Sequence, residues 1–369
     1  MVTLLLANCK VPFDPVLKPS DTNSLVVEGY IDGAAPVTFR LSRSRILSAR
    51  DTAARKYELN ARVLIEDDHQ NTYPLTESGN GIYSSNNILA LNAAYQYRLH
   101  IFTSNSREYI SDLVSFKQSP PIDTTGWKLK DDGVQIFVNT HDPNNATRYY
   151  RWEYSETWEF HSTYNTILKY LPDSNKVIPR TIPVLICWQS ANSTNILLGS
   201  SAKLSSDIIS EMPLVYIEPH DRKLSVLYSI WVKQYPLDLN GYNYWLAMKN
   251  NTESVGSIFD PQPNQTSGNI RCVTDPAENV VGYINAGNSF EKRTFISNNV
   301  LPLSWNQPMY CPMIDVPANP DSLNFYFNGG YGPIAPSILP SGGAAYSASY
   351  NRCTDCTLSG TNIKPVFWP

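Results

Sequence analysis

The chain has 369 residues, of which 42% are hydrophobic and 17% are charged, and its net charge is −4. The hydrophobic fraction excludes a globally disordered protein, and the low charge gives no sign of a nucleic-acid partner. At this length two domains are more natural than one. The 23 tyrosines, 8 tryptophans and 27 prolines are typical of exported β-proteins with many turns.

The chain begins with a short apolar run at 2–7, followed by Asn8 and Cys9. An apolar run that ends at a cysteine is typical of bacterial lipoprotein signals, although Asn8 replaces the usual small residue and no basic residue precedes the run. The run is too short for a transmembrane helix. We therefore expect residues 1–9 to be a signal remnant, with a lipid on Cys9 as the only membrane contact. A short buried first strand is the alternative.

Residues 10–23 contain three prolines and little apolar periodicity, which predicts a tether. From Ser24 onward, short alternating runs are separated by Gly, Asn, Asp or Pro clusters. About seven such runs within 24–118 have the spacing of an immunoglobulin-like β-sandwich. A hairpin turn is predicted at 67–70. The Cys–Trp–Cys arrangement of antibody domains is absent, so this prediction depends on the pattern alone.

The segment 119–123 contains two adjacent prolines and breaks the strand pattern, so we predict the domain boundary there. Residues 124–369 then predict a larger β-rich sandwich domain. Its longest alternating run, 147–162, places Tyr150, Trp152, Tyr154, Glu156 and Trp158 on one face. Residues 302–350 are rich in Pro, Gly, Tyr and Asn, and they predict long surface loops. The fold class is therefore mainly β.

One amphipathic helix interrupts the β pattern near 238–251. Asp238 can cap its first free amide groups, and Asn250 and Asn251 follow its last apolar turn. A single helix in a β-rich chain must pack on a sheet. Residues at helical spacing form one face: Leu239, Tyr242, Trp245, Leu246 and Lys249.

The cysteines predict disulfides, with zinc ligation and free thiols as alternatives. The pair Cys353-x-x-Cys356 lacks the thioredoxin-like helix start of a redox motif, and Cys187 and Cys311 stand too far apart in sequence to complete an obvious zinc site. In an oxidising compartment we expect Cys353 and Cys356 to bond to Cys187 and Cys311, in an order left open, or to each other. Cys272, in a strand-like run, is expected to stay unpaired. We expect no metal or cofactor.

Carboxylates along the run 147–162 could suggest acid–base chemistry. The simpler interpretation is a solvated face or ion pairs with nearby arginines, so we assign no catalytic residue and do not expect an enzyme. The residues concerned are Glu153, Glu156, Glu159 and His161, with Arg148 and Arg151 as candidate partners.

Aromatic residues are concentrated in 320–350 beside Gly329–Gly330 and Gly342–Gly343. Glycine allows close backbone approach, and tyrosine offers a rigid amphipathic face at low entropic cost. We therefore expect a surface that grips a partner or ligand, with coverage of a sheet edge or filling of the domain as the alternative. The six candidates are Phe325, Tyr326, Phe327, Tyr331, Tyr346 and Tyr350.

Short stretches spread over nearly the whole chain carry a family resemblance. They are LVVEGY (25–30), YYRWE (149–153), CW (187–188), YSI (228–230), QY (234–235), GSIFDPQP (256–263), GNI (268–270), GY (282–283), CTDC (353–356) and PVFW (365–368). Their order and spacing resemble a family of uncharacterised lipoproteins from Bacteroidota, a domain of unknown function. The resemblance implies accessory outer-membrane proteins encoded beside TonB-dependent receptors, and it supplies no catalytic residues.

The leading hypothesis is a lipid-anchored, surface-exposed outer-membrane protein that assists a TonB-dependent receptor. It would capture a small ligand, peptide or glycan, or cap the receptor. One alternative is a secreted glycan- or peptide-acting hydrolase on the second sandwich, which would need two carboxylates roughly 5–10 Å apart across a cleft. Another is a structural or adhesive surface protein. The transporter gene would lie next to this one only under the first hypothesis.

Overall fold

The computed structural model describes residues 23–45, 55–253, 268–305 and 309–369. These residues form a mainly β protein, as predicted. The chain divides into two compact units, one containing residues up to Gln118 together with Leu237–Ser289, the other Ser119–Pro236 together with Phe290–Pro369. The predicted boundary at 119–123 coincides with the first crossing between units. The prediction of two consecutive domains is wrong, because the chain returns to the first unit and leaves it again.

The first unit is one continuous series of short hydrogen-bonded strands, whose last member also pairs with a strand near its beginning. The strands are β1 (Leu25–Asp32), β2 (Thr38–Arg43), β3 (Lys56–Tyr57), β4 (Arg62–Asp67), β5 (Thr72–Gly79), β6 (Ile82–Ser84), β7 (Gln96–Phe102), β8 (Glu108–Ser111), β9 (Val114–Gln118), β19 (Ile270–Cys272) and β20 (Ala286–Asn288). Their order is β19-β8-β7-β4-β5-β6-β2-β1-β20-β9, β3 pairs with β2, and β9 also pairs with β7. The predicted hairpin at 67–70 joins β4 and β5.

The chain comes back to the first unit at Leu237–Ser289, which we call the returning segment. Its two three-residue strands, β19 and β20, complete this series of strands. β20 runs parallel to β1 on one side and to β9 on the other. β19 extends the edge beside β8 in antiparallel register. Ile270, Val280 and Ile284 from this segment are buried in the core of the first unit. Residues 24–118 therefore supply most of a sandwich-like unit but leave a gap between β1 and β9.

The predicted helix is present as α1 (Leu239–Glu253), and the Asp238 carboxylate accepts a hydrogen bond from the Gly241 amide at 2.7 Å. The face predicted to be apolar is not the buried one, because Leu239 is 52% exposed and Leu246 is 38% exposed. Gly241 and Tyr244 are buried instead. A Cβ on Gly241 would lie only 2.6 Å from the Asn285 side chain, so the absence of a side chain there sets which face approaches the unit.

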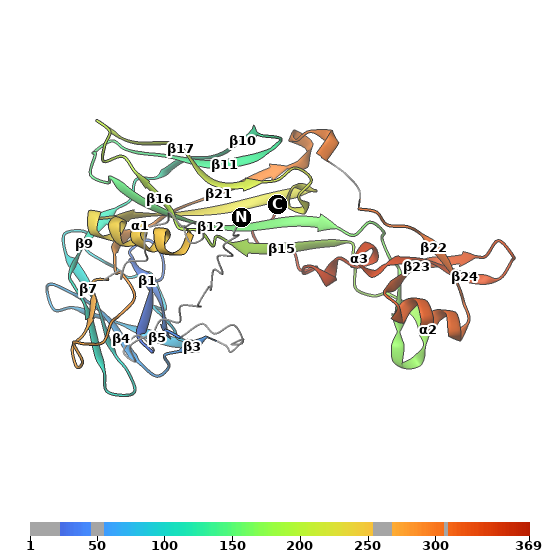
Figure 1. Cartoon of the computed structure of the whole chain (residues 1–369), viewed down its shortest axis with the longest axis horizontal. Coiled ribbons are helices and arrows are strands. Elements are labelled where there is room, and N and C mark those ends of the chain that lie inside the picture. The colour runs from blue at the N-terminus through green and yellow to red at the C-terminus, as the bar shows by residue number, and fades with distance from the viewer. Residues whose placement is uncertain (1–22, 46–54, 254–267, 306–308) are drawn as a thin grey trace, which may run out of the picture. The chain divides into compact units, whose positions relative to one another are not determined.

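Two sheets share the main core of the second unit (Figure 1). The first sheet holds β10 (Ile122–Lys130), β11 (Gly133–Asp142) and β17 (Asp207–Ile217). The second holds β15 (Ile186–Asn192), β12 (Tyr149–His161), β18 (Leu227–Leu237) and β21 (Phe290–Ser297) in that order, and β16 (Leu197–Ser200) also pairs with β12. The predicted aromatic face of β12 is confirmed, because Tyr150, Trp152 and Trp158 are buried. The unit is thus a sandwich, as predicted.

A buried amide joins the two sheets of the second unit. Gln234 on β18 is fully buried, and its side-chain oxygen accepts a hydrogen bond from the Trp152 indole at 2.8 Å. Its amide nitrogen donates to the Pro120 carbonyl at 2.9 Å and to the Thr140 hydroxyl at 3.2 Å. One side chain therefore satisfies groups from β12, β11 and the segment before β10.

Residues 302–350 are not long loops, so that part of the prediction is wrong. They include β22 (Ile314–Pro317), α2 (Pro320–Asn328), β23 (Tyr331–Ile338) and β24 (Ala344–Tyr350), followed by α3 (Asn351–Thr354), as Figure 1 shows. The strands pair in the order β22-β24-β23 and enclose a small core of Val316, Leu323, Phe327 and Ala348. We call residues 309–354 the C-terminal module.

Short elements complete the second unit. The hairpin strands β13 (Leu168–Leu171) and β14 (Lys176–Pro179) pair with each other, and their Tyr170 and Val177 pack on the core of the module. Short 3₁₀ helices are η2 (Pro172–Ser174), η3 (Arg222–Leu224), η4 (Asn298–Val300), η5 (Leu303–Trp305) and η6 (Cys356–Leu358).

Candidate functional site

Four of the six predicted aromatic residues form a continuous strip of rings on the C-terminal module. Ring centroids lie 5.1 Å apart between Phe325 and Tyr326, and 5.8 Å apart between Tyr326 and Tyr331. The centroids of Tyr331 and Tyr350 are 4.9 Å apart. We call these four residues the aromatic strip. It brings together α2, β23 and β24, and Phe325 at 73% exposure is its most accessible member.

The other two predicted residues do not belong to the strip. Phe327 is only 6% exposed and lies in the core of the module, where its ring centroid is 5.3 Å from that of Tyr170. Tyr346 is partly buried against the same core. Residues two apart on a helix point in very different directions, which is why Phe325 and Phe327 have different roles. The alternative prediction, filling of the domain, therefore holds for Phe327, whereas Tyr346 is only partly buried on that core, as are Tyr326 and Tyr331 of the strip.

Local turn chemistry places the strip. The Asn319 side chain caps α2 by accepting a hydrogen bond from the Ser322 amide at 2.9 Å, and Pro320 occupies the first turn. Gly330 has a φ of +98°, a conformation that favours glycine, and it turns the chain from α2 into β23. Gly342, at φ +93°, serves the turn between β23 and β24. Both glycines therefore serve turns.

The module carries few charges, but one cation lies against the strip: the Arg352 guanidinium is 5.3 Å from the centroid of the Tyr350 ring. Between residues 299 and 351 the sequence contains only two charged side chains, Asp315 and Asp321. Elsewhere on the module Tyr310 is 77% exposed, and Ile338, Met309 and Met313 are also exposed. A hydrogen bond with Tyr350, together with burial, raises the pKa of Tyr331, so this phenol stays protonated at physiological pH. Such a surface suits a protein or a neutral ligand better than a polyanion.

Two disulfides hold the module in place, and the pairing left open by the sequence is Cys187–Cys356 and Cys311–Cys353. Cys311 precedes β22 and Cys353 lies on α3, so one bond closes the module. Cys187 lies on β15, so the other ties the end of the module to the larger sheet. In the chain-entropy treatment, closing the shorter Cys311–Cys353 loop stabilises the folded state by about 4 kcal/mol, and closing the longer Cys187–Cys356 loop by about 5 kcal/mol. Cys272 is free and buried, as predicted.

The carboxylates of β12 do not form one acid–base cluster. Glu153 pairs with Arg151 at 2.6 Å, as predicted, and Glu159 pairs with His161 at 2.8 Å. Glu156 lies on the opposite, buried face. There it accepts hydrogen bonds from the Lys223 ammonium at 2.8 Å and from the Tyr228 hydroxyl at 2.7 Å. Burial and the Glu156 charge raise the pKa of Tyr228 well above its ordinary value.

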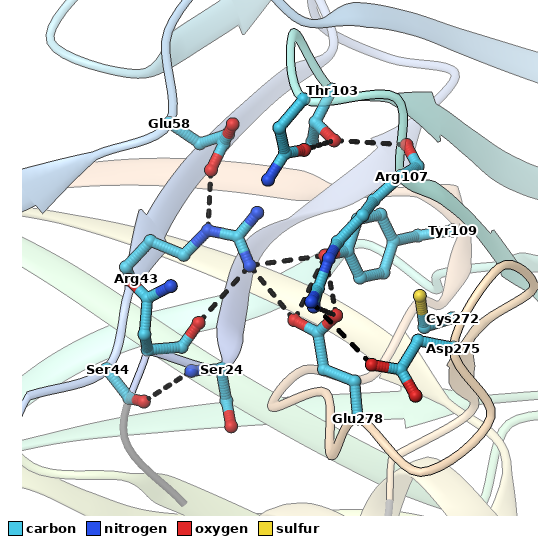
Figure 2. A network of polar contacts seen from close by, with 12 residues as sticks. Ser24, Arg43, Ser44, Glu58, Thr103, Arg107, Tyr109, Cys272, Asp275 and Glu278 are labelled. Carbon is cyan, nitrogen blue, oxygen red and sulfur yellow. Dashed lines mark hydrogen bonds and ion pairs between the residues drawn. The ribbon is translucent and has the colours of Figure 1, made fainter. Parts of the chain in front are cut away.

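The first unit contains a buried ionic network that sequence reasoning did not find (Figure 2). The Arg43 side chain is 3% exposed, and its Nε donates to Glu58 at 2.5 Å. Its Nη1 donates to Glu278 at 2.9 Å and to the Tyr109 hydroxyl at 3.2 Å. Burial raises the pKa of Tyr109 to about 12, so this phenol stays protonated. Since Arg43 and Glu278 are 235 residues apart, no local motif could have predicted their contact.

Arg107 and Asp275 extend this network toward solvent. The Arg107 guanidinium pairs with Glu278, and its other nitrogen lies 3.6 Å from the Asp275 carboxylate. Glu278 thus accepts from two arginines and one tyrosine. Among the described residues, the Nη2 atom of Arg43 is buried without a hydrogen-bond partner. We call Arg43, Glu58, Arg107, Tyr109 and Glu278 the Arg43 network.

Among the described residues, one group of three potential metal ligands lies within 4.8 Å: Asp67, Asp68 and His69 in the β4–β5 turn. The Asp67 carboxylate already accepts from the His69 amide at 3.0 Å and from the amide and side chain of Asn71 at 2.9 and 2.8 Å. Although burial acts in the opposite direction, these bonds from Asn71 and His69 lower the pKa of Asp67. The Asp67 side chain therefore stabilises the β4–β5 turn through these local hydrogen bonds.

Comparisons with known proteins identify a family but no activity. The sequence model of the family described as "Domain of unknown function (DUF4249)" matches residues 10–293, which ends before the C-terminal module. No curated protein matches the chain. A two-domain fibronectin type-III segment from chicken tenascin is 12% identical, covering 58% of this chain and 92% of that segment with a TM-score of 0.17. None of the described helices is long and apolar enough to span a membrane.

Proposed function

Since this chain belongs to the family described as "Domain of unknown function (DUF4249)", we propose that it is a lipid-anchored accessory protein of a TonB-dependent outer-membrane uptake system. In this proposal Cys9 carries the lipid and residues 10–23 are the tether. Cys9 and residues 10–22 lie outside the described residues. The C-terminal module contacts the receptor or its cargo, by capping the receptor or by presenting captured ligand.

The aromatic strip is the observation that supports this contact. It offers one exposed ring, Phe325, beside three partly buried tyrosine rings at fixed spacing. The module is closed by a disulfide, so little side-chain or backbone entropy is lost on binding. Aromatic anchors surrounded by neutral apolar side chains are typical of the centre of a protein interface. The two disulfides also suit an oxidising cell-envelope compartment.

We expect the double variant Phe325→Ala/Tyr310→Ala to lower receptor recovery at least tenfold. Both side chains are highly exposed, so the loss should fall on binding and not on folding. Removing two anchors of an interface costs a few kcal/mol, and each 1.4 kcal/mol is tenfold. The measurement is pull-down of the neighbouring TonB-dependent receptor from solubilised membranes, after a thermal melt has confirmed folding. Deleting α2 would be a poor test, because this helix carries Leu323 and Phe327 of the module's core.

The matched control is Leu204→Ala/Ile208→Ala, which removes two exposed apolar side chains elsewhere in the second unit. Receptor recovery with this control should stay within twofold of the wild-type value. Undiminished recovery with the aromatic variant would contradict the proposed contact. A second outcome would also contradict it: the unlipidated wild-type protein binds neutral phosphatidylcholine vesicles and the aromatic variant does not. The strip would then be a membrane contact.

We also expect the Cys9→Ser variant, expressed from a start upstream of the apolar run, to leave the membrane fraction. The physical reason is that a thioether-linked lipid is the only anchor in this proposal, and its loss removes about 0.8 kcal/mol for every buried CH₂. Fractionation followed by immunoblotting measures the shift, and Cys272→Ser, a substitution at a buried free thiol, serves as the control. A Cys9→Ser protein that stays with the membranes would rule out the anchor.

A further inference from the structure

The first described residues of the chain are held by the end of β2. The Asn23 amide donates to the Ser44 carbonyl at 3.2 Å, and the Ser24 amide donates to the Ser44 hydroxyl at 2.8 Å. The Asn23 carbonyl accepts from Nη1 of Arg43 at 3.3 Å. The same Arg43 nitrogen donates to Glu278, so the first described residues and the returning segment share one guanidinium (Figure 2).

The returning segment also holds β1 directly. Three residues after Glu278, the Val281 amide donates to the Leu25 carbonyl at 2.9 Å. The Val281 carbonyl accepts from the Val27 amide at 2.8 Å. At its amino end, β1 therefore has β2 on one side and this short bridge on the other. Glu278 fixes where the bridge begins.

The charges make this arrangement specific. The Glu278 side chain is 6% exposed and neutralises two arginines, one of which is almost fully buried. Removing one partner of a buried pair leaves an uncompensated charge, which is strongly unfavourable, whereas the intact pair adds little net stability over apolar packing. A network of this kind is best suited to selecting one register, here the contact of the returning segment with β1 and β2.

We propose that the Arg43 network is a latch, closed by Glu278, that locks the amino end of β1 to the returning segment. Tension applied at Asn23 would first peel β1 from its neighbours, and the latch opposes that step. The inference concerns the folded chain only, and it holds whether or not Cys9 carries a lipid. Its failure would therefore leave the proposed function untouched.

The experiment uses the whole chain in a Cys9→Ser background and measures alkylation of the Cys272 thiol by iodoacetamide. Cys272 is buried on β19 within the returning segment, so it reacts only when that segment opens. Glu278→Ala should speed alkylation at least tenfold, and Glu278→Gln, which keeps the shape without the charge, should give a smaller increase. Glu28→Ala is the matched control, because Glu28 pairs with Arg55 at a half-exposed surface site, and it should change the rate less than twofold.

Hydrogen exchange separates a latch from general stabilisation. In Glu278→Ala, the Val27 and Val281 amides should exchange at least tenfold faster, while amides of the central strand β4 change less than twofold. An equal increase in β1 and β4 would overturn the proposal, because the network would then be an ordinary contribution to global stability. No increase in either would overturn it as well. If the alanine variant fails to fold, Glu278→Gln answers the same question by the same two measurements.

Discussion

Residues 24–118 expressed alone are expected to show no cooperative thermal transition, whereas the same residues joined to 237–289 by a Gly/Ser linker should melt cooperatively. The isolated span lacks β20, which fills the space between β1 and β9. It also loses buried core side chains of the returning segment: Ile270, Cys272, Val280, Ile284 and Ala286. Burying a large aliphatic side chain stabilises by about 1.5–3 kcal/mol, so the three aliphatics together approach the whole stability of a small domain, about 5–15 kcal/mol.

Circular dichroism and calorimetry on the two proteins measure this difference. A third protein, in which the linker carries a scrambled version of residues 268–289, controls for length and composition. The expectation would be contradicted if residues 24–118 alone melted cooperatively at the same temperature as the protein joined to 237–289. Residues 24–118 would then be a complete domain.

The second large effect is expected from Gln234→Leu, which should lower the free energy of unfolding of the second unit by about 1–3 kcal/mol. Leucine fills a similar volume but leaves the Trp152 indole buried without its acceptor. The Pro120 carbonyl loses the Gln234 amide but keeps the hydrogen bond from the Ser119 hydroxyl at 3.0 Å. One buried donor without a partner costs about 1–3 kcal/mol. Urea unfolding followed by tryptophan fluorescence is the measurement, since every tryptophan except Trp245 lies in the second unit.

Gln189→Leu provides the matched control, because Gln189 is an exposed glutamine on β15 of the same unit. That substitution should change the free energy of unfolding by less than about 0.5 kcal/mol. If Gln234→Leu were as mild as the control, the bridging role of the amide would be wrong.

Alternating patterns predicted the structure well wherever a strand has one buried and one exposed face. β1, β2, β4 and β7 lie in such runs, where Val, Ile, Leu, Phe or Tyr alternate with polar residues. β19 and β20 have three residues each, which is too short for any alternation to be visible. The sequence therefore could not indicate that the first unit needs a second segment.

The C-terminal module was missed for a different reason. β23 and β24 are built from Pro, Gly, Ala, Ser and Tyr, residues whose composition is typical of turns, and β23 carries an irregularity between Pro333 and Ala335. Pairing with neighbours overrode local propensity here, as it often does in strands. Within the aromatic set, only the helix geometry of α2 separates exposed Phe325 from buried Phe327.

The cysteine predictions show what spacing can and cannot decide. The identity of the four bonded cysteines was predicted from the expected oxidising compartment and the strand-like setting of Cys272. The pairing order did not, because Cys353 and Cys356 are too close in sequence for loop length to favour either choice. The Arg43 network could not be predicted from the sequence. Glu278 meets Arg43 only after the chain has left the first unit and returned to it.

The placement of the disulfides has a consequence for how the chain matures during synthesis. Each native bond needs either Cys353 or Cys356, and both follow every strand in the described chain. Until these two residues emerge, Cys187 and Cys311 have no correct partner and are free to react with each other or with Cys272. The native disulfides can therefore form only after Cys353 and Cys356 have been synthesised. Any earlier Cys187–Cys311 bond must first be broken by thiol exchange.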